Sequence, residues 1–216
     1  MGVSQFMKQE VARLREDNEL LKEELYALRR YIDSVHALID AVDDLDPSSP
    51  IMPLLERTLF NAQTVVNATE GSLLILDEET DDLVFVLAKG TMADRLQGRR
   101  MPHDKGIAGW VVHNAKPTIV NNAPADDRFY AGIDEALQFK THSVLAAPII
   151  GRNRMLGVVE VLNKRDGEPF NEMDQSLLML LCRLAGDVLY AMMDQEEPGH
   201  STSASAGLTA EETPSI

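Results

Sequence analysis

The sequence contains little cysteine and few basic residues. Its single cysteine, Cys182, cannot form an intramolecular disulfide, and no Cys-x-x-Cys pair supports a structural zinc site. Lys and Arg number 20 against 35 Asp and Glu, so the 216 residues carry a formal net charge of −15. This charge repels polyanions, which argues against nucleic acid and anionic membrane surfaces as partners. We expect a protein or a small molecule as the partner.

Targeting and membrane-spanning segments are also missing from the sequence. The first residues, MGVSQFMKQEVARLRED, are too charged for the apolar part of a signal peptide. No stretch reaches the roughly 18 consecutive apolar residues of a transmembrane helix. These features predict a cytoplasmic protein.

The sequence shows no arrangement of residues typical of catalysis. Its histidines lack the spacing of metal ligands, and its Ser, His and Asp residues form no nucleophile motif. The histidines are His36, His103, His113, His142 and His200. Cys182 lies in an apolar segment, where a core position is expected. We therefore predict that the protein is not an enzyme and has no metal site or cofactor, apart from a small-molecule ligand.

Charge and composition divide the chain into residues 1–44, 45–193 and 194–216. The last segment consists mainly of Ser, Thr, Ala, Gly, Pro and acidic residues, with too little apolar surface to offset the entropy lost on ordering. We expect it to be a disordered acidic tail. Pro47 and Pro50 interrupt helical structure after the first segment, which predicts a short joint there.

The first segment has the apolar repeat of a coiled coil. Its apolar residues recur at alternating steps of three and four, as at the a and d positions of a heptad. These positions are Val11, Leu14, Asn18, Leu21, Leu25, Leu28, Ile32, Val35, Ile39 and Val42. Asn18 is the one polar member. Its amide can pair across two helices in register, so we expect it to fix the register at a cost in stability.

The charges beside this seam favour a parallel arrangement, because the g positions are acidic and the e positions are basic. They are Glu10, Asp17 and Glu24 at g, and Arg15, Lys22 and Arg29 at e. In a parallel pair each acid faces a base of the other helix, whereas an antiparallel pair brings like charges together. We expect a parallel homodimer, and Val35 and Val42 at d leave a parallel trimer open. The alternative is an amphipathic helix packed on its own domain.

The middle segment predicts an α+β fold. One broad apolar face spans Leu54 to Val66 and predicts a helix that ends at Gly71. Two pairs of apolar strand-length runs, each pair joined by a polar turn, predict antiparallel hairpins. The runs are 72–76 with 83–88, and 144–150 with 155–162. A mixed insert with a short helix from about Gly106 lies between the hairpins, and a final helix spans about 172–193. This order indicates an antiparallel sheet with helices on one face and a concave insert on the other.

Four motifs in this segment resemble those of GAF domains, in the same order and spacing, over roughly residues 50–193. They are GIAGWVV at 106–112, DDRF at 126–129, FKTHSVLAAPI at 139–149 and GVVEVLNK at 157–164. The resemblance implies a GAF-like antiparallel sheet flanked by helices. It also implies signal transduction through the binding of a small molecule.

The sequence is most similar to the GAF subset found in cyclic nucleotide phosphodiesterases and adenylyl cyclases. That subset has a signature after the last strand, which stands here as Asn163, Lys164, Phe170 and Asp174, with Gln175 in place of a Glu. The resemblance implies a structural role for this motif, in which a salt bridge between Lys164 and Asp174 holds the connection from strand to helix.

The same resemblance places ligand-binding residues in the insert and in the last strand. They are Ile107, Ala108, Asp134, Thr141 and Glu160. The first amides of a helix opening at Gly106 would donate hydrogen bonds to a phosphate or a carboxylate. The alternative is that the small residues here, such as Ala108 and Gly109, only allow tight packing of the helix on the sheet. Glu160, a lone acid among valines, requires either a donor or solvent. It therefore faces a pocket or an exposed side of the strand.

Three residues of this sequence depart from the cyclic-nucleotide subset. Ala88, Lys89 and Leu137 stand at positions where that subset has residues expected to contact the ligand. Four basic residues, Arg95, Arg99, Arg100 and Lys105, either draw an anion toward the pocket or are simply solvated. The leading hypothesis is a GAF protein that senses a small molecule, such as a cyclic nucleotide, and signals through a coiled-coil homodimer to a downstream protein. The alternative is a ligandless GAF scaffold for dimerisation and protein interaction. A cavity with converging polar groups favours the first, and a filled core favours the second.

Overall fold

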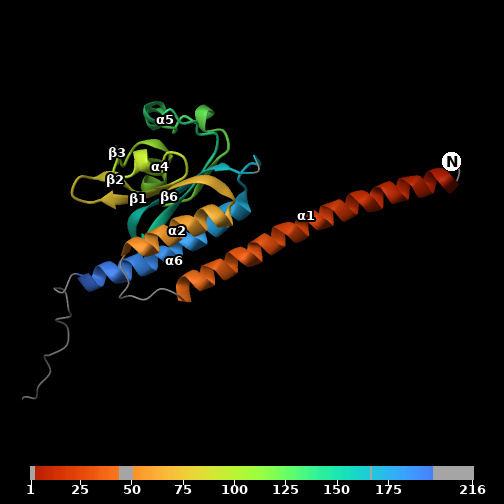
Figure 1. The fold of residues 1–216 in the computed structure, drawn as a ribbon, viewed down its shortest axis with the longest axis horizontal. Helices are drawn as coiled ribbons and strands as arrows, with labels where there is room; N and C mark the ends of the chain where they lie inside the picture. Colours follow the sequence, from red (N-terminus) through yellow and green to blue (C-terminus); the bar gives the residue numbers. More distant parts are fainter. Residues whose placement is uncertain (1–2, 44–50, 166, 197–216) are drawn as a thin grey trace, which may run out of the picture.

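A computed structural model describes residues 3–43, 51–165 and 167–196 (Figure 1). Its elements are α1 (Val3–Asp43), α2 (Ile51–Val65), β1 (Ala68–Asp77), β2 (Asp82–Lys89), α3 (Ala93–Leu96), β3 (Arg100–Pro102), α4 (Gly106–Asn114), β4 (Thr118–Val120), the 3-10 turn η1 (Ala123–Ala125), α5 (Ala131–Leu137), β5 (Val144–Gly151), β6 (Arg154–Lys164) and α6 (Glu172–Glu196). The predicted joint at residues 46–50 lies outside the described residues, as does the predicted tail beyond residue 196.

The strands form one antiparallel sheet in the order β3-β2-β1-β6-β5-β4. Both predicted hairpins are present, as β1–β2 and β5–β6. The two hairpins meet at the centre of the sheet, where β1 pairs with β6. The expected α+β fold is confirmed.

Two helical layers cover the two faces of this sheet (Figure 1). The long helices α2 and α6 pack side by side on one face, and the shorter α4 and α5 lie on the other. The residues of β6 alternate between these layers: Val159 and Val161 belong to the core under α2 and α6, whereas Val158 belongs to the core under α4. The sheet therefore separates two apolar cores, and the candidate site lies on the α4 side.

Helix α6 lies unusually close to the sheet. A Cβ atom added at Gly186 would collide with the backbone of Ile150, and one added at Gly151 would collide with the backbone of Gly186. Residues Glu172–Met193 of α6 are long and apolar enough to cross a membrane by length and composition alone. In this fold the same helix packs against β5 and α2, as core helices do.

The structure corrects several details of the sequence analysis. Helix α2 ends at Val65, not at Gly71, because Asn67 adopts a left-handed φ of 54° and turns the chain into β1. Gly71 lies within β1, where a Cβ atom would contact Leu59 and Gln63 of α2 at 3.0 Å. The last helix runs to Glu196, three residues beyond its expected end. The sequence analysis missed β3, β4 and α3, which have only three or four residues each.

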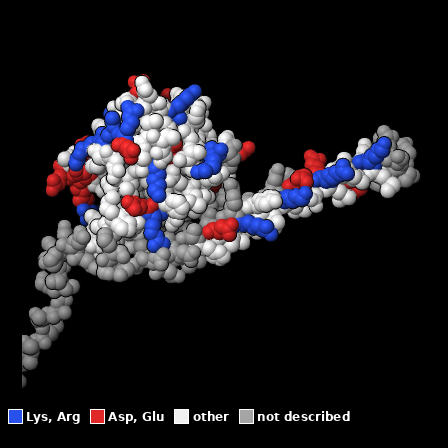
Figure 2. Space-filling model, viewed as in Figure 1, with Lys and Arg blue, Asp and Glu red and all other residues white. Residues whose placement is uncertain are grey.

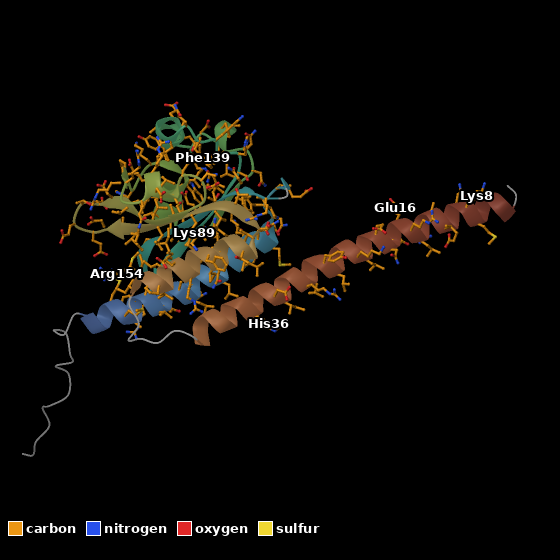
Figure 3. The ribbon with its side chains drawn as sticks, viewed as in Figure 1. Lys8, Glu16, His36, Lys89, Phe139 and Arg154 are labelled. Carbon is orange, nitrogen blue, oxygen red and sulfur yellow. The ribbon has the colours of Figure 1, made fainter. Side chains whose placement is uncertain are left out.

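Helix α1 has 41 residues and extends well beyond the domain (Figure 1). It contacts α2 and α6, while the turns that carry Lys8 and Glu16 stand clear of the domain (Figure 3). Six apolar residues of the predicted seam are between 44% and 63% exposed, namely Val11, Leu14, Leu21, Leu25, Leu28 and Ile32. Basic and acidic side chains follow one another along this helix (Figure 2), and local ion pairs join Arg13 to Asp17 and Lys22 to Glu19.

Candidate functional site

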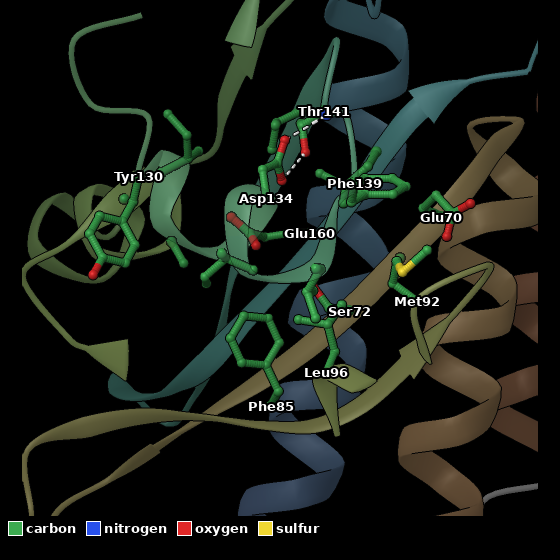
Figure 4. A pocket seen from close by; sticks show the side chains of 18 of the residues that line it. Glu70, Ser72, Phe85, Met92, Leu96, Tyr130, Asp134, Phe139, Thr141 and Glu160 are labelled. Atoms are coloured by element: carbon green, nitrogen blue, oxygen red, sulfur yellow. Dashed lines mark hydrogen bonds between the residues drawn. The ribbon is translucent and has the colours of Figure 1, made fainter. Parts of the chain in front are cut away.

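A cavity lies between the sheet and the layer formed by α3, α4 and α5 (Figure 4). Its open space is about 80 Å³, several times the roughly 10–15 Å³ that one water molecule requires. Most of its walls are apolar or aromatic. These wall residues are Phe85, Met92, Leu96, Met101, Ile107, Phe129, Tyr130, Ile133, Leu137, Phe139, Val144 and Leu162. All five ligand-site residues predicted from the sequence also line this cavity: Ile107, Ala108, Asp134, Thr141 and Glu160.

Glu160 is the central polar group of the cavity. It lies on β6 opposite Ser72 of β1, so both side chains face the same side of the sheet (Figure 4). Burial raises the pKa of Glu160 to about 7, although a hydrogen bond from the backbone N–H of Ala108 acts in the opposite direction. The half-buried side chain lines the cavity, which is the first of the two alternatives stated above for this residue.

Asp134 and Thr141 form a pair at the cavity wall (Figure 4). The backbone N–H of Thr141 donates to Asp134 Oδ2 at 2.7 Å, and its hydroxyl donates to Oδ1 at 2.8 Å. Both carboxylate oxygens of Asp134 therefore already accept a hydrogen bond. These hydrogen bonds link α5 to the segment that precedes β5.

The start of α4 contributes backbone and small side chains to the cavity, through Gly106, Ile107 and Ala108. The backbone N–H of Ala108, one of the first amides of this helix, donates a hydrogen bond to Glu160. Gly109 serves the packing alternative, because a Cβ atom there would collide with the backbone of His103 and Asp104. The helix start thus binds an acid of the protein itself.

The basic residues before α4 are exposed and have partners within the protein. Arg95 donates to the carbonyl oxygens of Leu137 and Ala136 at 2.8 and 3.1 Å, which links α3 to the end of α5. Arg99 donates to the Arg95 carbonyl. Arg100 pairs with Asp77, and Lys105 lies 3.4 Å from Asp104.

At the edge of the cavity, Lys89 and Glu70 also have partners. The Lys89 ammonium lies 4.9 Å from the centre of the Phe60 ring. The carboxylate of Glu70 accepts hydrogen bonds from the backbone N–H and the hydroxyl of Thr91, at 2.8 and 3.0 Å. Among the described lining residues, Lys89 is the only Lys or Arg.

The motif after β6 has the geometry of a structural clamp. Lys164 Nζ donates to Asp174 Oδ2 at 2.7 Å, and both side chains are buried. Asp174 also caps the start of α6, because it exchanges hydrogen bonds with Asn171. Asn163, with a left-handed φ of 53°, accepts from the amides of His142 and Ser143, and Phe170 exchanges hydrogen bonds with Asn121. None of these motif residues lines the cavity.

Cys182 is buried in the core on the opposite side of the sheet, where burial raises the pKa of its thiol. It does not line the cavity. Within residues 3–43, 51–165 and 167–196, no group of three or more His, Cys, Asp and Glu side chains could hold a metal ion. The cavity therefore offers an acid of raised pKa and an apolar enclosure as its chemistry.

Several lining residues were not identified from the sequence. Ser72 reaches the cavity only through the pairing of β1 with β6, which joins residues far apart in the chain. Phe85 follows the alternation of β2 and could have been assigned to this face once the sheet was known. Phe139 begins one of the motifs quoted above, but its role in the wall depends on the loop geometry.

The family model of the GAF domain matches residues 53–189 of this chain. Two solved GAF domains with the same fold share a fifth or less of their residues with it. The GAF domain of a phosphoenolpyruvate-protein phosphotransferase from Coxiella burnetii is 18% identical, with a TM-score of 0.66 over 76% of this chain and 98% of that one. The corresponding GAF domain from Acinetobacter is 20% identical, with a TM-score of 0.62 over 76% and 96%.

A free methionine-R-sulfoxide reductase from Neisseria meningitidis, solved with its substrate, is also similar. It is 18% identical, with a TM-score of 0.60 over 73% of this chain and 87% of that one. Identities of this size show a shared fold and leave the ligand of this chain to be argued from its own residues.

Proposed function

The chain belongs to the GAF domain family, and from this premise we propose that it is a non-catalytic sensor of a small molecule. Its cavity would bind the ligand, and a parallel coiled-coil homodimer formed by α1 would transmit the change to a downstream protein. The observation that carries the proposal is the cavity itself, in which Glu160 stands among apolar and aromatic walls. A ligandless scaffold would not need such a space, because filled cores are more stable.

Burial of Glu160 supports a binding role through its energetic cost. A carboxyl group surrounded by apolar side chains destabilises the fold when it ionises. On the same face of β6, the position two residues before Glu160 is the buried Val158, so an apolar residue would fit this face of the sheet. Costly polar groups of this kind are typical of functional sites.

The dimer is supported by the exposed seam of α1. A helix about 60 Å long, at roughly 1.5 Å per residue, presents Leu14, Leu21, Leu25 and Leu28 to solvent. A second copy of the helix would cover this stripe and would place each acidic g position against a basic e position. Because α1 contacts α2 and α6, a change in the domain has a direct path to the coiled coil.

Calorimetric titration of the full chain tests the binding proposal. Because of the resemblance to the cyclic-nucleotide subset, cAMP and cGMP are the first ligands to titrate, followed by a panel of metabolites and by native mass spectrometry of the purified protein. A cavity-filling variant, Ala108→Phe, should weaken binding by at least about tenfold, or 1.4 kcal/mol. The matched variant Ala136→Phe, on the exposed side of α5, should leave binding unchanged.

The same experiment identifies the alternative. If no small molecule accompanies the protein or binds to it, and Ala108→Phe leaves the oligomer and the melting temperature unaltered, the ligandless scaffold is the better description. If a ligand binds with equal affinity to both variants, its site lies outside the cavity.

A further inference from the structure

The charged residues of the cavity indicate which sign of charge a ligand should carry. This inference rests on the proposed function. Three acidic residues line the cavity, Glu70, Asp134 and Glu160, against one basic residue, Lys89. Lys89 is exposed and interacts with the Phe60 ring of α2. An anionic group inside the cavity would therefore meet an excess of acidic groups, with its one cation at the exposed edge.

The three acidic side chains differ in how many hydrogen bonds they already accept from the protein. Asp134 accepts two hydrogen bonds from Thr141, and Glu70 accepts two from Thr91. Glu160 has the Ala108 amide as its neighbour from α4. A carboxylate has about four acceptor sites, so Glu160 retains acceptor capacity directed at the centre of the cavity.

The walls suit an organic cation. Phe85, Phe129 and Phe139 line the cavity together with Glu160, and the faces of aromatic rings attract cations by about 0.5–2 kcal/mol. An ammonium group would donate to Glu160, and its apolar body would contact the aromatic and aliphatic walls.

We propose that the cavity binds a small organic amine, which is held as a cation by Glu160 and by the surrounding aromatic side chains. The amine would pair with the ionised form of Glu160, so binding would release the proton that this group retains near neutral pH. The other charged groups that line the cavity, Glu70, Asp134 and Lys89, have the partners described above.

Three compounds of nearly equal shape test the proposal: benzylamine, benzyl alcohol and benzoate. Binding to the full chain is followed by chemical-shift changes of the cavity residues at millimolar concentration. We expect benzylamine to bind at least about tenfold more tightly than benzyl alcohol, and benzoate to bind most weakly. Benzylamine affinity should also fall from about pH 8 to about pH 6, as Glu160 gains a proton.

Glu160→Gln keeps the shape of the side chain and removes its charge. In this variant benzylamine should lose about tenfold or more in affinity, whereas benzyl alcohol should change by less than about threefold. Glu135→Gln, an exposed acid on α5 that does not line the cavity, is the matched control and should change neither compound. Thermal unfolding of each variant confirms that it is folded.

Two results of the benzylamine series would overturn the proposal. One is equal or tighter binding of benzoate, and the other is benzylamine binding that is undetectable or insensitive to Glu160→Gln. Binding of cAMP or another anion that Ala108→Phe abolishes would reject the amine and would leave the sensor function intact. Failure of every titrated compound together with the absence of any ligand in native mass spectrometry would reject both.

Discussion

Ionisation of Glu160 lowers the free energy of unfolding, and this effect depends on pH. Its pKa of about 7 in the folded protein exceeds its ordinary value of 4.5, so the folded chain keeps a proton that the unfolded chain releases. The contribution of this group to stability is therefore fully present below about pH 4.5 and is lost as the pH rises through about 7.

The variant Glu160→Gln should thus be more stable than the natural protein at neutral and higher pH. At about pH 8 we expect its free energy of unfolding to be larger by on the order of 2 kcal/mol, with a gain near zero at about pH 4.5. Urea unfolding at the two pH values, at one protein concentration, measures the difference. Glu135→Gln serves as the control, and a gain of equal size at both pH values would contradict the assigned titration.

Lys164 and Asp174 form a buried ion pair that responds differently to substitution. Replacing Lys164 with Met leaves Asp174 buried without its cation, which should cost about 3–5 kcal/mol of stability. The exposed Lys116→Met should change stability by less than about 0.5 kcal/mol. Thermal and urea unfolding measure both variants. A small loss in Lys164→Met would show that the Asn171 amide alone satisfies Asp174.

At the scale of elements, α5 is held over the cavity by two attachments. Asp134 joins it to Thr141, and Arg95 caps its final carbonyl groups. A seven-residue helix is too short to be stable without such contacts. Opening of this segment would expose the cavity, because Ile133, Asp134 and Leu137 of α5 are among its wall residues.

The variant Arg95→Gln should loosen α5 without unfolding the domain. Loss of the charged hydrogen bonds costs about 1–3 kcal/mol locally, so amide hydrogen exchange in residues 131–139 should accelerate roughly tenfold or more. Exchange in α6 should stay unchanged. Arg183→Gln, an exposed position on α6, is the control. Uniform acceleration across the chain would indicate global destabilisation instead.

The elements predicted from the sequence are those in which the pattern of apolar residues is long enough to be recognised. Both hairpins, α2, α4 and α6 were found because apolar residues repeat over several turns or strand positions. The three-residue strands β3 and β4 carry too few residues for a period to emerge. The five proposed site residues converge on one cavity, but the use of the Ala108 amide by Glu160 depends on how α4 is placed over β6, which no local pattern encodes.

At the scale of the whole molecule, α1 presents an apolar stripe that a second copy would cover. Removing residues 1–44 should reduce the mass measured by light scattering from that of a dimer to that of a monomer. The GAF domain should remain folded, because the described residues that make up its two buried cores all lie between Leu54 and Met192. A truncated protein that stays fully dimeric would place the main interface on the domain.

The orientation of the two helices can be tested with single cysteines, because Cys182 is buried. A parallel coil in register brings each d position next to its own counterpart. Leu14→Cys should therefore form a disulfide between two chains under mild oxidation, seen as a dimer on non-reducing gels. Glu16→Cys, which points away from the seam, is the matched control. Equal cross-linking of both positions would contradict the parallel arrangement.

Strand β6 separates the cavity on one face of the sheet from the core on the other face. Glu160 faces the cavity, while its direct neighbours Val159 and Val161 pack in the core beneath α2 and α6. A strand moves as a unit, because its backbone is bonded to β1 and β5 on both sides. A ligand that displaced Glu160 would therefore also displace the residues on which α2 and α6 pack. Because α1 contacts both of these helices, such a displacement would reach α1 across the sheet.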